Sequence, residues 1–237
     1  MNMEEYLKVK DFTYLEYCDY LQQKYGIGLC NYMSENYRIQ SKCKRTKDGL
    51  IAHHKMEDRA IMLSNVEFAK ANPYEYQLKE NIVYCDYLEH LLLHILICKY
   101  PAEDKNPDEI VGFGGAYEFL IPELNDVYSG WVTKQAWRKI CYDKIINNKD
   151  VYLELLKLFV QIEHINPQEL CRSFNSIYGI WSNENNRQLY NEIIRQCGPI
   201  YLEYLENKPP VVIKNKNPIK KNPIKKILSK ILKIFQK

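Results

Sequence analysis

Several features that identify common protein classes are absent from this chain of 237 residues. None of its eight cysteines forms a CxxC pair, so we do not expect a zinc site made of four cysteines. The first residues, MNMEEYLKVKDF, lack the basic segment and apolar stretch of a signal peptide. Scattered cysteines without an export signal are typical of reduced thiols, and we therefore expect a cytoplasmic protein.

Long apolar runs and familiar phosphate-binding or nucleophile motifs are also missing. The longest apolar run near the middle, LLLHILIC at 91–98, is short and contains a histidine, so we expect no membrane span. The sequence has no Walker or GxGxxG loop, serine nucleophile elbow or DxD carboxylate cluster. The string GFGG at 112–115 is better interpreted as a turn before a helix than as a phosphate cradle.

Charge is distributed unevenly between the body of the chain and its end. Residues 1–207 carry 23 Lys and Arg against 30 Asp and Glu, whereas residues 208–237 carry ten lysines and no acid. The tail repeats NPIKK at 217–221 and 222–226 and ends in an amphipathic segment over 224–236. We expect this tail to raise the affinity for nucleic acid. The alternatives are docking on the body of the protein or on a second copy, and contact with an anionic membrane.

Hydrophobic periodicity predicts an α+β fold that is mostly α-helical. A helix is expected over 3–25, followed by short strands over 50–54 and 81–84 and a strongly helical segment over 86–100. The long loop between the strands is expected to hold a helix over 64–71, capped by Ser64. Further helices are expected over 114–126, 133–148 with Thr133 as cap, 150–164 with Asp150 as cap, 167–178 with Pro167 at its first position, and 183–206 broken near Gly198-Pro199.

Four of the five histidines lie between positions 53 and 94, and their spacing follows the predicted elements. His53 and His54 close the first strand, and Asn81 opens the second. His90 and His94 lie four residues apart on the following helix, so they project from the same face one turn apart.

This strand, strand and helix pattern resembles the ββα-metal motif of HNH nucleases, and its histidines are closest to the colicin-type DNase variant. The strings GLIAHHK and KENIVYCDYLEHLLLH carry the resemblance, with nine residues from Asn81 to His90 and four more to His94. The 27 residues from His54 to Asn81 exceed the interval in compact members. The resemblance covers under a third of the chain and implies a nuclease motif over 45–101. Periodicity and charge in the rest of the sequence predict a helical segment over 1–44, a helical domain over 102–207 and a basic, partly disordered tail over 208–237.

The resemblance also implies metal-dependent hydrolysis of phosphodiester bonds in DNA. Such a reaction needs a nucleophilic water, a base and a cation. We expect His54 to be the general base, with its ring held by the side-chain amide or backbone carbonyl of Asn81. His53, His90 and His94 are the expected ligands of one divalent ion, for which Zn, Ni, Mn and Mg are candidates. Because His53 and His54 point to opposite sides of a strand, its end must twist or bulge for both to serve one site.

Basic residues around the first strand are candidate phosphate contacts, although a solvated loop would have the same composition. Three other functions fit the sequence: an RNase or toxin-like nuclease with the same site, a non-catalytic metal-stabilised nucleic-acid-binding module, and a membrane-surface protein. The region 102–207 carries no chemical signature and is interpreted as a scaffold or a partner and specificity module. A role in defence, phage biology or DNA processing fits a nuclease. The candidate phosphate contacts are Lys42, Lys44, Arg45, Lys47, Lys55 and Arg59.

Overall fold

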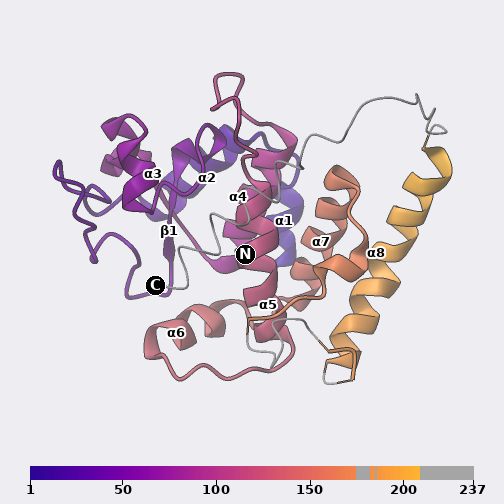
Figure 1. The fold of residues 1–237 in the computed structure, drawn as a ribbon. Coiled ribbons are helices and arrows are strands. Elements are labelled where there is room, and N and C mark those ends of the chain that lie inside the picture. Colours follow the sequence, from indigo (N-terminus) through magenta and orange to yellow (C-terminus); the bar gives the residue numbers. More distant parts are fainter. Residues whose placement is uncertain (175–181, 185, 209–237) are drawn as a thin grey trace. The chain divides into compact units, whose positions relative to one another are not determined.

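Helices dominate the computed structural model, which describes residues 1–174, 182–184 and 186–208 (Figure 1). Within these residues the strands form one two-stranded antiparallel sheet, made of β1 (Ile51–His54) and β2 (Ile82–Cys85). The prediction of a mostly helical α+β fold is confirmed at this level. The expected tail beyond 208, with its lysine repeat and amphipathic segment, lies outside the described residues.

The N-terminal segment contains two helices where one had been expected over 3–25. They are α1 (Met3–Val9) and α2 (Tyr14–Tyr25). Thr13 separates them because it caps α2: the backbone N–H of Glu16 donates to its hydroxyl, and its own N–H donates to the Glu16 carboxylate. This reciprocal capping box stabilises a new helix start and fixes an extended backbone at Thr13.

The sheet aligns the two strands so that His53 lies opposite Val83 and His54 opposite Ile82. The first strand starts one residue later than predicted and ends at His54 as expected. The second begins one residue later than expected, because Asn81 belongs to a preceding 3-10 turn, η3 (Lys79–Asn81). An isolated two-stranded sheet is only marginally stable in water, and here β2 packs on α2 and α4.

Helix α4 (Tyr87–Lys99) confirms the prediction over 86–100 and forms the centre of the core. The Asp86 carboxylate caps it by accepting hydrogen bonds from the backbone N–H groups of Leu88 and Glu89, both at 2.8 Å. It packs against α2, α6 (Ala136–Ile145) and α7 (Lys149–Glu163), which surround it in Figure 1. Almost every residue of α4 is therefore buried, including the apolar residues next to His90 and His94.

The long segment between the strands is ordered by short turns and its own small core. It comprises η1 (Lys55–Asp58), α3 (Val66–Lys70), η2 (Tyr74–Gln77) and η3. Helix α3 is shorter than predicted and is capped by Asn65 in place of Ser64, because the Asn65 side chain accepts from the Glu67 N–H at 2.9 Å. The small core beneath this segment consists of Tyr32, Met33, Cys43, Ala69 and Ile82.

The second half of the described chain is helical, as predicted, with shifted boundaries. Its elements are a π-helix η4 (Gly115–Leu120), α5 (Ile121–Tyr128), α6, α7, a 3-10 turn η5 (Pro167–Leu170) and α8 (Arg187–Asn207). None of the helices among the described residues combines the length and the apolar character needed to cross a lipid bilayer.

Several predicted helix ends in this half were wrong. Gln135 precedes α6 where Thr133 had been expected, and α7 starts before Asp150, after Asn148. The helix expected over 167–178 is reduced to η5 as far as Ser173, and residues 175–178 are outside the described part. Helix α8 continues through Gly198-Pro199, because burial of one helix face in the core compensates for the missing proline N–H.

Candidate metal centre

The three predicted ligands converge where β1 meets α4. His53 comes from the strand and His90 and His94 from one face of the helix, and their nearest ligand atoms all lie within 4.8 Å of one another. His90 Nε2 is 3.0 Å from His53 Nδ1 and 3.2 Å from His94 Nε2. Ligand atoms bonded to one ion at 2.0–2.1 Å lie about 2.9–3.4 Å apart, depending on the coordination angle. The cluster is buried and has the spacing of a group that could hold a metal ion.

Tyr14 on α2 sets the orientation of the His53 ring. Its hydroxyl oxygen is 2.9 Å from His53 Nε2 and 3.0 Å from the carbonyl oxygen of Lys55. Since a carbonyl only accepts, the tyrosine O–H donates to Lys55 and the tyrosine oxygen accepts from Nε2–H of His53. The Nδ1 lone pair of His53 then faces the cluster, which is the arrangement that metal-binding histidines require.

The GFGG string, predicted as a turn before a helix, packs directly against His94. Gly112 has a φ of +79° and leads into η4, which begins at Gly115. A Cβ on Gly115 would lie 2.1 Å from Cε1 and 2.3 Å from Nδ1 of His94. The imidazole therefore occupies the space that any side chain at 115 would fill, and this glycine allows the ring to reach the cluster.

His54, the predicted base, is held by Gln77 and not by Asn81 as expected. The Gln77 amide nitrogen donates to the Leu63 carbonyl at 3.1 Å, so its oxygen is the atom that lies 3.3 Å from His54 Nε2. This pairing assigns the proton to Nε2 and leaves the Nδ1 lone pair free to accept one. Tyr32 packs against the same ring, with centroids 4.4 Å apart.

Asn81 contributes to this arrangement from a distance. Its side-chain amide donates to the Glu75 carbonyl at 2.7 Å, which ties η3 back to η2. The backbone carbonyl of Gln77 accepts a hydrogen bond from the backbone N–H of Tyr32 at 2.7 Å. The turn that carries Gln77 is thus held by Asn81 at one point and by Tyr32 at another. The Asn81 amide therefore holds the turn next to Gln77, and Gln77 takes the place at the His54 ring that was expected for Asn81.

Glu57 is a site residue that the sequence reasoning missed. It lies in η1, directly after His54, and its two carboxylate oxygens reach both sides of the strand end. Oε2 is 3.5 Å from His53 Nδ1 and 3.5 Å from His94 Nε2, while Oε1 is 3.8 Å from His54 Nδ1. The spacing HHxxE was the sequence signal that could have pointed to Glu57. A tight turn that follows a strand brings the third residue of the turn back over the end of the strand.

Burial keeps the imidazoles of this site neutral. It lowers the pKa of His54 and of His94 to about 4. Burial, together with the neighbouring imidazoles, holds the pKa values of His53 and His90 well below the ordinary 6.5. Burial has the opposite effect on the carboxyl of Glu57, whose pKa it raises to about 8. The histidines are thus in the neutral form that metal coordination requires.

The predicted phosphate contacts fall into two groups. Lys55 pairs with Asp19 at 2.6 Å and Arg59 with Asp104 at 2.9 Å, so both cations are already engaged. The run before β1 remains at the surface: Lys42 and Lys47 are exposed and Lys44 is half-buried. The Arg45 guanidinium stacks 3.8 Å from the Trp137 ring centroid on α6.

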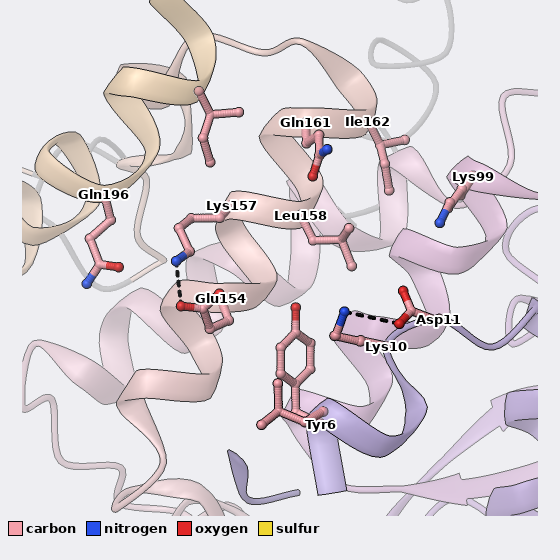
Figure 2. Close-up of a pocket in the computed structure, with 12 residues that line it drawn as sticks. Tyr6, Lys10, Asp11, Lys99, Glu154, Lys157, Leu158, Gln161, Ile162 and Gln196 are labelled. Atoms are coloured by element: carbon pink, nitrogen blue, oxygen red, sulfur yellow. Dashed lines mark ion pairs between the residues drawn. The ribbon is translucent and has the colours of Figure 1, made fainter. Parts of the chain in front are cut away.

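A cavity of about 860 Å³ lies elsewhere, between α1, the end of α4, α7 and α8 (Figure 2). No histidine lines it. Lys10 pairs with Asp11 at 3.0 Å and Lys157 with Glu154 at 2.5 Å, so much of its charge is neutralised internally. We therefore do not place the chemistry there.

Comparisons of the chain with protein-family models, with curated proteins and with solved structures find no match.

Proposed function

We propose that this protein is a metal-dependent endonuclease of the HNH type that hydrolyses phosphodiester bonds of DNA. One observation carries the proposal: three neutral imidazoles converge at ligand spacing beside a fourth, His54, whose free nitrogen faces the same carboxylate as two of them. A histidine cluster that served only packing would not need the ring orientations that Tyr14 and Gln77 impose.

The order of the elements supports the resemblance in the sequence. His53 and His54 end β1, β2 pairs with it in antiparallel register, and His90 and His94 follow one turn apart on α4. This is the strand, strand and helix order of the ββα-metal motif. The long interval between the strands folds as a separate set of turns and leaves the pairing of β1 with β2 undisturbed.

Each residue has a distinct role in this proposal. A divalent ion held by His53, His90 and His94 would supply positive charge that stabilises the phosphate as negative charge develops. His54 accepts the proton of the attacking water at Nδ1, while Gln77 keeps the other proton on Nε2. The ionised form of Glu57, 3.8 Å from Nδ1, favours the protonated imidazole that results.

Access to the site comes from the side of His90 and Glu57. His53 and His54 are 1% exposed, whereas His90 is half-buried and the Glu57 side chain is 15% exposed. Positive charge for a polyanion comes from Lys42 and Lys47 before β1 and, on sequence grounds, from the tail. RNA stays the alternative substrate, because these groups contact phosphate and not the sugar.

A cleavage assay with a matched histidine control tests the proposal. Purified protein is incubated with plasmid DNA and with total RNA in Mg, Mn, Ni or Zn, beside His54→Ala and His164→Ala variants. His164 is exposed at the C-terminal end of α7, outside the site. We expect His54→Ala to lose cleavage by about 10²–10⁴-fold, the usual contribution of a general base, while metal binding stays intact. The His164→Ala variant should cut like the wild type.

Two results would count against the proposal. Cleavage by His54→Ala at the wild-type rate would remove His54 as the base. Tight metal binding by the wild type without cleavage of either nucleic acid in any of the four metals would favour a metal-stabilised binding module.

A further inference from the structure

The carboxylate of Glu57 lies beside His53 and His94, at an edge of the histidine cluster where no ligand has yet been assigned. Its Oε2 lies at the same distance, 3.5 Å, from His53 Nδ1 and from His94 Nε2. Two ligands of one ion at right-angled or tetrahedral positions are separated by about 2.9–3.4 Å. The two distances from the carboxylate oxygen to its histidine neighbours are thus close to the separation expected for ligands that share one ion.

The charge around Glu57 points to the same conclusion. Among the described residues, the ion-pair contacts of Glu57 are made with histidines alone, which burial keeps neutral. The two nearest cations in the sequence are paired elsewhere, Lys55 with Asp19 and Arg59 with Asp104. A divalent ion among the imidazoles would supply the positive charge that a largely buried carboxyl needs in order to ionise and bind as a ligand.

We propose that Glu57 is a fourth protein ligand of the metal ion, so that the site is composed of three imidazoles and one carboxylate. The inference rests on the metal site of the proposed function and adds a ligand to it. A tetrahedral ion would be saturated by these four side chains, whereas a five- or six-coordinate ion keeps positions for substrate. Ions such as Mn, Co and Ni, which accept higher coordination, are therefore better matched to catalysis here than Zn.

The alternative role for Glu57 is to position His54 without contacting the ion. Metal affinity and the visible spectrum of bound Co(II) separate the two roles, because both depend on the ligands and neither needs turnover. The variants are Glu57→Gln, which keeps the shape but removes the charge, and Glu57→Asp, which keeps the charge on a shorter side chain. Glu67→Gln, which changes an exposed carboxylate on α3, is the matched control.

We expect Glu57→Gln to lower the Co(II) affinity at least tenfold, equivalent to about 1.4 kcal/mol, and to change the absorption spectrum of the Co(II) protein. Glu57→Asp should recover part of the affinity. Glu67→Gln should match the wild type in both measurements. Thermal melting without metal checks the fold: Glu57→Gln should melt no lower than the wild type, because it removes a buried ionisable group, and it should gain less from added Co(II).

Wild-type affinity and an unchanged Co(II) spectrum in Glu57→Gln would overturn the inference and leave the three-histidine site standing. If the wild type itself binds none of Co(II), Ni, Mn or Zn, both the inference and the proposed function fail. A variant that binds Co(II) normally but has lost cleavage would assign Glu57 to positioning His54, which also contradicts the inference.

Discussion

Replacing Gly115 by alanine is a direct test of His94 as a metal ligand. The new Cβ would lie 2.1 Å from Cε1, 2.3 Å from Nδ1 and 2.6 Å from Nε2 of His94. Carbon atoms in contact are normally about 3.5–4.0 Å apart, so the ring would have to move by more than about 1 Å. The backbone of α4 is packed on several sides and cannot absorb this shift, so the imidazole must rotate away from His53 and His90.

The magnitude follows from the loss of one ligand and from overpacking. We expect metal affinity to fall by more than the roughly 10–100-fold that loss of an outer-shell partner costs. Inserting a methyl group into a filled space should also lower the free energy of unfolding by about 1–3 kcal/mol. Affinity is measured by competition with a chromophoric chelator, and stability by denaturant unfolding without metal.

The neighbouring glycine provides a matched control. A Cβ on Gly114 would meet nothing within 4 Å, and its φ of −61° suits any residue. Gly114→Ala should therefore bind metal normally and be as stable as the wild type or more stable, by up to about 1 kcal/mol. In the double variant Gly115→Ala with His94→Ala the clash disappears, so stability should be regained while affinity stays low. Equal metal affinity in the Gly115→Ala and Gly114→Ala variants would refute the assignment of His94.

Three further predictions concern the support of the site, its protons and the tail. Tyr14→Phe removes the acceptor of His53 Nε2–H and should lower metal affinity by about 10–100-fold in the same titration; an unchanged value would mean that Tyr14 does not orient the ligand. Because the folded pKa of His54 is about 4 against an ordinary 6.5, its contribution to stability is present above pH 6.5 and is lost as the pH falls toward 4. Between pH 7 and 4.5 the free energy of unfolding of the metal-free protein should therefore fall by about 2 kcal/mol less in His54→Gln than in the wild type. Equal falls in the two proteins would contradict the depressed pKa. Deleting residues 208–237, which carry ten lysines and no acid, should weaken DNA binding and flatten its salt dependence, and an unchanged slope in a salt titration would exclude the tail from DNA contact.

The tertiary structure determines which residues complete the site. Gln77, Glu57 and Tyr14 are ordinary residues in the sequence, and their proposed roles depend on distances that no local pattern encodes. Tyr14 reaches His53 because α2 packs on the sheet, and Gln77 reaches His54 because η2 folds back over β1. Asn81 stood at the expected interval, but a one-residue shift in the strand start placed its amide on a turn.

Local patterns in the sequence determined the elements and the spacing of the proposed ligands that lie within one element. Asp86 and Glu89 define the start of α4, and the interval of four places His90 and His94 on one face whatever the rest of the chain does. How His53 meets them, and how one carboxylate serves both sides of β1, depended on the turn after His54 and on the packing of β1 against α4. Helix periodicity and capping act within a few residues, whereas a site built across three elements is formed by contacts between residues far apart in the chain.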